Sequence, residues 1–232
     1  MELFWKADLH IHSSCSRDAF NPPKKIIAYA KKRGLDAIAI TDHNTMDCVD
    51  YIIEHGKKNG ILVIPGIEIK TSQGELIAYY PESPIQKGLS LRETIIAIKE
   101  AKGIIAVPHP FDRLRRSAVK TKNFEEIVHL VDVVEAWNAR TTFIPDNVKA
   151  YNITLKYNKG MSAGSDAHFP YEIGRSYVLM KPFNNKRDFL DALKQARVVP
   201  GQSPLFVHIP STIAKMVNKG VKPRGLRNYW IK

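Results

Sequence analysis

The chain of 232 residues lacks the usual features of secreted and membrane proteins. Its two cysteines are too few for a disulfide framework, which favours a reducing compartment. No apolar run approaches the length of a membrane span, and polar residues from Asp8 onward occupy the place of a signal peptide's apolar core. We therefore expect a cytoplasmic protein with no membrane partner.

Acidic residues are the scarcer charge. The chain holds 23 Asp and Glu against 35 Lys and Arg, which gives a formal net charge of +12 and suits anionic partners such as phosphates or nucleic acid. Residues 202–232 carry six of the cations, no acid and the aromatic pair Tyr229-Trp230. We expect one folded domain over residues 1–201 and a basic C-terminal extension over residues 202–232, which either contacts an oligonucleotide or is a solvated end.

Apolar runs and helical patterns alternate along the chain. The apolar runs predict strands at residues 4–12, 37–40, 61–69, 104–107, 133–137, 161–163 and 176–180, the third of them broken at Pro65-Gly66. Amphipathic segments predict helices at residues 22–33, 46–58, 90–103, 124–130, 146–157 and 187–196. Residues 72–79 predict a turn and a returning strand. The alternation predicts an α/β fold with parallel strands joined by crossover helices.

Two α/β architectures compete. A doubly wound sheet usually has a glycine-rich phosphate loop after its first strand, but residues 13–18 contain no glycine. Polar residues instead follow strand after strand, and only a closed barrel brings all those C-terminal strand ends to a common mouth. We therefore predict a barrel with its functional site at the C-terminal mouth of the strands.

A pair of histidines ends the first predicted strand. His10 and His12 point to the same face, about 6.6 Å apart at the backbone, so both imidazoles reach one cation. Alone, the pair fits two histidines on a solvated face equally well. Cys15 follows closely, either as a metal contact or as a small buried residue. With later strand ends included, the predicted mouth contains His10, His12, Asp18, His43, Glu68, His109, Asp166 and His168.

Imidazoles and carboxylates together suit Zn, Mn or Fe, and this set exceeds the needs of one ion. We expect two or three divalent ions that share a carboxylate, with Glu68 as the bridge. Ions roughly 3.5–4 Å apart share a hydroxide that attacks phosphorus at neutral pH, which predicts a phosphoesterase. The residues expected to carry the catalytic step are His10, His12, Glu68, Asp166 and His168.

These motifs resemble the PHP (polymerase and histidinol phosphatase) family over about residues 5–180. The motifs are Asp8-x-His10-x-His12, Thr41-Asp42-His43, Pro65-Gly66-x-Glu68, Pro108-His109-Pro110 and Gly164-Ser165-Asp166-Ala167-His168. The resemblance implies a distorted seven-stranded (β/α) TIM-like barrel, a trinuclear metal site and phosphoesterase activity. It assigns the first metal to His10, His12, Glu68 and Asp166, the second to Glu68 and His109, and the third to Asp18, His43 and His168.

The chain departs from the family in the hairpin after the bridging glutamate. Many small members have a histidine there, where this sequence has Gly74-Glu75-Leu76. Either Glu75 serves as the oxygen ligand of the second metal or that site is weaker. Glu135 is a further candidate ligand. Asp8 and Asp42 are expected to accept hydrogen bonds that fix the ligand imidazoles.

Phosphate recognition needs cations near the mouth, and guanidinium groups suit the fork geometry of a phosphate. The candidates are Arg17, Arg113, Arg116, Arg140 and Arg175, with Arg115 beside the second and third. At least one is expected to bind substrate phosphate, the others being solvated surface charges.

The basic charge favours nucleotides or the 5′-phosphates of short oligonucleotides as substrates. Histidinol phosphate is the alternative substrate. The alternative function without catalysis is an RNA-associated barrel scaffold. An amidohydrolase barrel also begins with two histidines in this spacing, but it usually needs a bridging carboxylated lysine where Glu68 stands.

Overall fold

The computed structural model describes residues 3–204. Within this range one sheet contains nine strands in the order β7-β6-β5-β4-β3-β2-β1-β8-β9. The strands are β1 (Trp5–Ile11), β2 (Ala37–Ile40), β3 (Leu62–Lys70), β4 (Glu75–Tyr79), β5 (Ile104–Val107), β6 (Val133–Asn138), β7 (Gly160–Gly164), β8 (Tyr177–Met180) and β9 (Arg197–Val199). The helices are α1 (Pro23–Lys32), α2 (Val49–Lys58), α3 (Leu91–Glu100), α4 (Thr121–Ile127), α5 (Ile144–Lys156) and α6 (Lys186–Lys194), with short 3₁₀ turns η1 (Val128–Leu130) and η2 (Pro170–Glu172).

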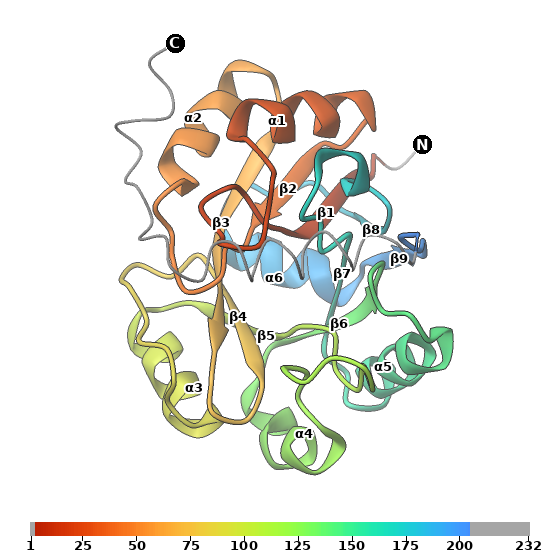
Figure 1. Cartoon of the computed structure of the whole chain (residues 1–232). Helices are drawn as coiled ribbons and strands as arrows, with labels where there is room; N and C mark the ends of the chain where they lie inside the picture. The colour runs from red at the N-terminus through yellow and green to blue at the C-terminus, as the bar shows by residue number, and fades with distance from the viewer. Residues whose placement is uncertain (1–2, 205–232) are drawn as a thin grey trace.

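The sheet curls into a nearly closed barrel. Figure 1 shows α1 and α2 on one side of it, α3, α4 and α5 on the other, and α6 visible through the ring. The ring closes where the terminal strand β7 lies against β1, and just beyond these strands His12 donates its backbone N–H to the carbonyl of Ala167 at 3.0 Å. Gly164 at the end of β7 lies so close to His10 that a Cβ on the glycine would collide with the Cβ of the histidine. The predicted α/β barrel is confirmed.

One end of the barrel is closed by α6. Residues near the starts of several strands, among them Ala7, Ala37 and Val133, form one buried cluster with Phe189 and Leu193 of α6. Burial of these side chains removes apolar surface from water and fills the interior below the site. The C-terminal ends of the parallel strands therefore form the open mouth.

The returning strand predicted at residues 72–79 is present as a hairpin: β4 runs antiparallel to β3, and also to β5. The prediction that the other strands run parallel is wrong for β8. β8 runs antiparallel to β1, and it pairs with β9, for which the sequence predicted no strand. The predicted break in β3 is also wrong: the strand continues through Pro65, whose carbonyl accepts from the N–H of Tyr80 at 2.7 Å.

A capping box starts α3, the third predicted helix. Ser90 accepts from the N–H of Glu93 at 3.3 Å, and the carboxylate of Glu93 accepts from the N–H of Ser90 at 2.8 Å. Each bond satisfies a backbone donor that the first helical turn leaves without a partner. The helix α3 therefore begins where the sequence places it.

The chain after β9 packs back on β6. Trp137 donates from its indole N–H to the carbonyl of Gly201 at 2.9 Å, and Ser203 donates its backbone N–H to Ala139 at 2.7 Å. Residues 205–232, which contain most of the predicted basic extension, lie outside the described residues. The domain boundary at residue 201 stays a prediction. None of the helices within residues 3–204 combines the length and apolarity that a membrane span requires.

Candidate metal centre

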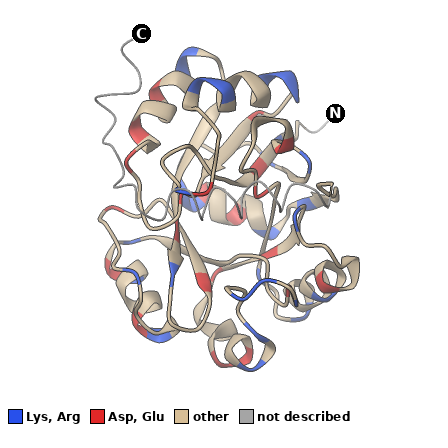
Figure 2. Ribbon diagram, viewed as in Figure 1, with Lys and Arg blue, Asp and Glu red and all other residues tan. Residues whose placement is uncertain are grey.

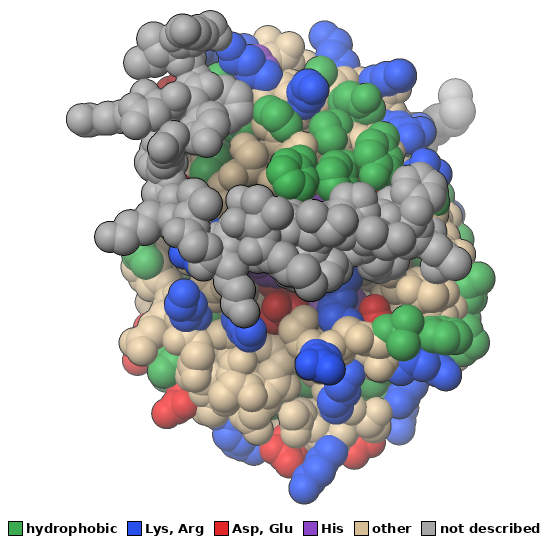
Figure 3. Space-filling model, in the orientation of Figure 1, with side chains coloured by type: hydrophobic (Ala, Val, Ile, Leu, Met, Phe, Trp, Pro, Cys, Tyr) green, Lys and Arg blue, Asp and Glu red, His purple; other side chains and the backbone are tan. Residues whose placement is uncertain are grey.

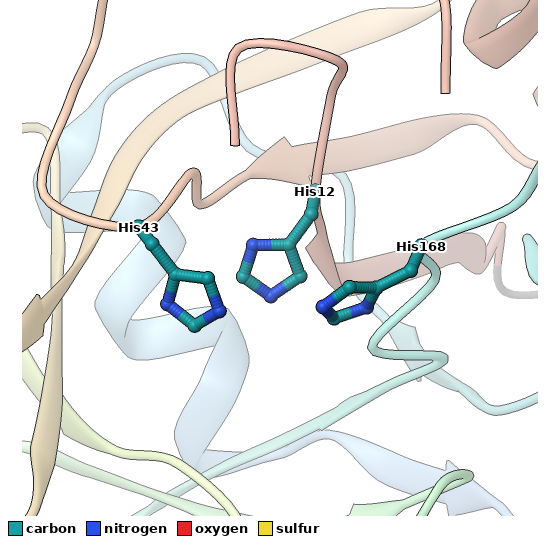
Figure 4. Close-up of side chains that lie close together, drawn as sticks. All are labelled: His12, His43 and His168. Atoms are coloured by element: carbon teal, nitrogen blue, oxygen red, sulfur yellow. The ribbon is translucent and has the colours of Figure 1, made fainter. Parts of the chain in front are cut away.

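The five histidines that follow strands converge at the mouth. His10 and His12 are buried at the end of β1, with their Nε2 atoms 3.1 Å apart. Figure 4 shows His12, His43 and His168 turning their rings toward one another from three separate segments. The ring centroid of His12 lies 4.4 Å from that of His43 and 4.4 Å from that of His168. Histidines predicted as metal ligands therefore come from distant parts of the sequence and meet at one place.

A first group of four donor atoms surrounds one point. Nε2 of His12 lies 3.4 Å from Oε2 of Glu68 and 3.2 Å from Oδ1 of Asp166. Nε2 of His10 lies 3.6 Å and 3.7 Å from the same two oxygens. Tetrahedral donors at about 2.0–2.2 Å from an ion lie about 3.3–3.6 Å apart. These four side chains, which the resemblance assigns to the first metal, have the spacing that one ion requires.

Glu68 also faces a second group through its other oxygen. Oε1 of Glu68 lies 2.9 Å from Nε2 of His109, and that nitrogen lies 3.7 Å from Oε2 of Glu75. Both carboxylates and the imidazole are buried. The hairpin β3–β4 thus brings Glu75 to the place where a second ion would need an oxygen ligand.

A third group forms around Asp18. Its Oδ2 lies 3.3 Å from Nε2 of His43 and 3.5 Å from Nε2 of His168. The other nitrogen of His43 lies 2.9 Å from Oε2 of Glu68, which links this group to the first. Nδ1 of His168 lies 2.8 Å from the carbonyl of Asp166, and a hydrogen bond there leaves Nε2 as the ligand atom.

Several carboxylate oxygens in the centre make no hydrogen bond within residues 3–204. They are Oε2 of Glu68, Oε2 of Glu75 and Oδ1 of Asp166, all buried. A buried carboxylate oxygen without a donor is costly, because burial removes its hydration. A divalent cation at these positions supplies the missing interaction. The donor set therefore fits metal ions.

Charges in the centre keep its carboxylates ionised. Burial raises the pKa of Glu68, but His43 and His10 outweigh it and hold the pKa well below its usual range. Burial likewise raises the pKa of Asp166, and Arg115 and His10 outweigh it. Ionised oxygens are the form that binds cations.

Glu135 lies behind His10 and away from the ligand groups. Its Oε1 accepts from Nδ1 of His10 at 3.0 Å, and its Oε2 accepts from the backbone N–H of His109 at 2.5 Å. Nδ2 of Asn138 also donates to Oε2 at 3.0 Å. The interpretation of Glu135 as a metal ligand is wrong: it turns Nε2 of His10 toward the centre, as carboxylates behind ligand histidines do. No sequence motif identified Asn138 as part of the site.

Asp8 and Asp42 accept hydrogen bonds around the centre, as predicted, but they act on the backbone and on serines and not directly on an imidazole ring. Asp8 accepts from the N–H and hydroxyl of Ser165 at 2.9 and 2.6 Å and from the N–H of Gly174. Asp42 accepts from Ser13 and from the hydroxyl of Ser16. Both carboxylates therefore hold the loops that carry ligands. Burial raises the pKa of each to about 6 despite these hydrogen bonds.

Arg115 makes a direct contact with a carboxylate of the centre. Its Nη2 donates to Oδ2 of Asp166 at 2.5 Å, and its Nε lies 3.7 Å from Asp112. Asp112 also accepts from the backbone N–H of Arg115 at 3.3 Å, which bends the loop after β5 back over the mouth. From the sequence alone, Arg115 is marked only by its position shortly after His109, and Arg113 and Arg116 share that position.

The five arginines of the predicted phosphate set lie in varied places, and Figure 2 shows Lys and Arg spread over helices and loops on both sides of the barrel. Arg113 is largely exposed and forms an ion pair with Asp146 at 2.7 Å. Arg140 is buried, with Nε 3.5 Å from Glu172. The others are exposed or half-buried, namely Arg17, Arg116 and Arg175. Which of these arginines binds a substrate phosphate stays a prediction.

A disulfide joins Cys15 to Cys48, which the sequence did not predict. Cys15 lies in the loop between His12 and Asp18, and Cys48 precedes α2. The bond therefore ties the loop after β1 to the loop after β2, which carries His43. With its sulfur in this bond, Cys15 is not the metal contact that the sequence left open.

Backbone strain marks two positions in the centre. His109 has φ 28° and Asp166 has φ 52°, in the left-handed region that residues other than glycine seldom occupy. Such strain persists where the surroundings impose it, most often at functional sites. Here the bond from His109 N–H to Glu135 and the pair between Asp166 and Arg115 hold the two residues.

Comparisons with known proteins agree with this geometry. The family model described as "PHP domain" matches residues 8–202. "Uncharacterized protein MJ0417" of Methanocaldococcus jannaschii is 33% identical over 82% of this chain and 79% of its own length. A protein of Caldicellulosiruptor saccharolyticus named "Probable phosphatase" is 25% identical over 77% of this chain and 87% of its own.

Among solved structures, a two-domain protein from Bacteroides vulgatus has the same fold. Its description is of a protein "containing predicted PHP-like metal-dependent phosphoesterase". The superposition has a TM-score of 0.72 at 20% identity and covers 91% of this chain and 70% of that one.

Proposed function

The chain belongs to the PHP domain family, and from that membership we propose that it hydrolyses phosphomonoesters with the help of bound divalent ions. The observation that carries the proposal is Glu68, whose two oxygens face two different histidine groups. A carboxylate placed in this way suits a bridge between two ions. The relative named "Probable phosphatase" supports the same class of reaction.

We assign the ligands by group. His10, His12, Glu68 and Asp166 would hold the first ion, and Glu68, His109 and Glu75 the second. Asp18, His43 and His168 would hold a third. Two or three ions of Mn, Zn or Fe fit this mixture of imidazoles and carboxylates. When bound, such ions act as Lewis acids that activate water and stabilise charge on the phosphoryl oxygens.

The residues around the ligands orient the site. Glu135 holds the ring of His10 so that Nε2 faces the centre, and Asp42 holds Ser16, whose hydroxyl lies 3.4 Å from Nδ1 of His12. Arg115 keeps a positive charge beside Asp166, where its remaining N–H donors face an incoming phosphate. Such fixed charges stabilise a phosphoryl transition state without reorganisation during the reaction.

Nucleotides and the 5′-phosphates of short oligonucleotides are the favoured substrates, because the net charge of +12 attracts polyanions. Histidinol phosphate is the alternative substrate. A scaffold that binds RNA without catalysis would share the charge but would have no use for buried, ionised carboxylates at one mouth. The cytoplasmic location follows from composition alone, and the disulfide between Cys15 and Cys48 does not support it.

A panel of phosphate esters tests the proposal. The full chain, loaded separately with Mn, Zn or Fe, is assayed against nucleoside 5′-monophosphates, a short 5′-phosphorylated oligonucleotide and histidinol phosphate. Release of inorganic phosphate in proportion to bound metal supports hydrolysis. Protein that binds metal but releases no phosphate from any ester would favour the scaffold.

A further inference from the structure

Three aromatic rings form a stacked row beside the metal centre. The rings of Phe20 and Phe169 lie 5.5 Å apart between centroids at 26°, and those of Phe169 and Tyr171 lie 5.6 Å apart at 16°. Phe20 belongs to the loop after β1, and the other two belong to the loop after β7. We call these three residues the aromatic row.

The aromatic row is joined to the ligands of the third group. Phe20 comes two residues after Asp18, and Phe169 directly follows His168. The backbone N–H of Phe20 donates to the carbonyl of His168 at 2.8 Å. Figure 3 shows hydrophobic side chains gathered over the loops after β1 and β7, on the face where histidine is also visible. The row and the centre therefore share one side of the molecule.

The loop after β7, which carries Phe169 and Tyr171, is held by three hydrogen bonds. The buried carboxylate of Glu172 accepts from the backbone N–H groups of His168 and Phe169 at 2.9 and 3.0 Å. The guanidinium of Arg33, the residue after α1, donates to the carbonyl of Tyr171 at 3.4 Å. A surface held in this way loses little conformational entropy when a ligand stacks on it.

The aromatic row is open to solvent, unlike the rings that pack below the barrel. Phe20 is 50% exposed, and Phe169 and Tyr171 are partly exposed. In contrast, Phe183 and Phe189, which also pack ring to ring, are buried in the cluster below the barrel. Adjoining exposed rings beside a phosphate site are the arrangement by which proteins stack nucleobases.

We propose that Phe20, Phe169 and Tyr171 form a stacking surface for the base of a nucleoside 5′-phosphate whose phosphate binds at the metal centre. The inference rests on the proposed function and narrows its substrate class to esters that carry a base. Stacking depends on the π-face that every base has, so the row accepts any base. The row should therefore bind nucleotides more tightly than sugar phosphates, which have no base.

Substitution of the exposed ring tests the proposal. Dissociation constants of adenosine 5′-monophosphate and ribose 5-phosphate are measured by calorimetry on full-length, manganese-loaded protein, for the wild type and for Phe20→Leu and Phe169→Leu. Leucine retains apolar volume but removes the ring. Tyr151→Leu is the matched control, because Tyr151 is a 37% exposed aromatic on α5. The wild type and the control should bind the nucleotide at least about tenfold more tightly than the sugar phosphate, and each Phe variant should lose most of that ratio.

The outcomes separate this inference from the proposed function. Equal affinities of the wild type for the two ligands, or an unchanged ratio in both Phe variants, would overturn the stacking surface even if esters are hydrolysed. A base-dependent ratio that both variants lose would support it even if no ester in the panel is hydrolysed. A change of oligomeric state in Phe20→Leu with an unchanged ratio would assign the row to contacts between copies of the chain and overturn the proposal.

Discussion

Arg115 donates from Nη2 to Oδ2 of Asp166 at 2.5 Å, while Oδ1 of the same carboxylate lies 3.2 Å from Nε2 of His12. One carboxylate thus connects an arginine to a ligand histidine. The guanidinium lowers the pKa of Asp166 against the effect of burial. The ionised form of this candidate ligand is favoured by a residue of the loop after β5.

Arg115→Ala should reduce kcat/KM for a phosphomonoester by about 10- to 100-fold, because a charge-assisted hydrogen bond contributes about 1.5–3 kcal/mol. Steady-state kinetics at saturating metal would measure the loss. Arg187→Ala is the control, since Arg187 is exposed on α6 at the closed end of the barrel. Equal activity of Arg115→Ala and the control would show that the pair with Asp166 is structural only.

Glu68→Gln should remove most activity and lower the metal content, because an amide bridges poorly and reduces the negative charge of the centre. Elemental analysis of the wild type should give two or three equivalents of Mn, Zn or Fe per chain. Glu82→Gln changes an exposed carboxylate and should retain both metal and activity. A single equivalent in fully loaded wild type would reject a multinuclear centre, and near-native turnover of Glu68→Gln would show that another residue bridges.

The stability conferred by Asp8 should fall as pH rises. Its pKa is about 6 in the folded chain against an ordinary 3.8, so ionisation of this buried carboxyl opposes folding. The contribution is complete below about pH 4 and is lost as pH rises through about 6, a change of about 3 kcal/mol. Urea unfolding with chelator should show the wild type losing that amount relative to Asp8→Asn between about pH 4 and about pH 7. Parallel stability curves would contradict the raised pKa.

Cys15→Ser should lower the free energy of unfolding by about 3–4 kcal/mol, because the disulfide closes a loop whose ends are 33 residues apart. Cys48→Ser should cost the same, and the double variant no more than either. Urea unfolding without reductant would measure these values, and dithiothreitol should bring the wild type to the level of the variants. Identical midpoints for oxidised wild type and Cys15→Ser would show that the bond does not stabilise the fold.

Deletion of residues 221–232 should weaken cleavage of a 5′-phosphorylated oligonucleotide and flatten its salt dependence, while largely sparing a mononucleotide. The deleted segment contains Lys222, Arg224, Arg227 and Lys232 with the pair Tyr229-Trp230. Each phosphate that a cation neutralises steepens the dependence of affinity on salt. Kinetics at several salt concentrations would measure it. Equal effects on long and short substrates would leave the segment as a solvated end.

Much of the barrel and its ligand set follows from the sequence. His10 and His12 alternate with buried Leu9 and Ile11, so a strand with two inward imidazoles is the direct consequence. The other ligands follow strands, and parallel strands deliver their C-terminal ends to one mouth. The returning strand β4 follows from the turn residues before it, whereas the antiparallel direction of β8 depends on its pairing with β1.

Other features depend on contacts that no local pattern encodes. Glu135 holds a ligand because it meets Nδ1 of His10 across the sheet, whereas the sequence shows only a carboxylate after an apolar run. Arg115 differs from Arg113 and Arg116 only because Asp112 bends the loop that carries all three. Cys48, the disulfide partner of Cys15, lies in the next βα unit, and the spacing of the two cysteines in the sequence does not predict that they pair.

Gly164 has a consequence for which substitutions the chain tolerates. Its φ is not positive, so the glycine is required by space: a methyl group there would meet the Cβ, the N and the Cα of His10. Gly164→Ala would have to separate β7 from β1 and carry His10 and Asp166 apart. A methyl group in place of one hydrogen, at a residue with no side chain to bind a metal, would therefore disturb the candidate metal centre.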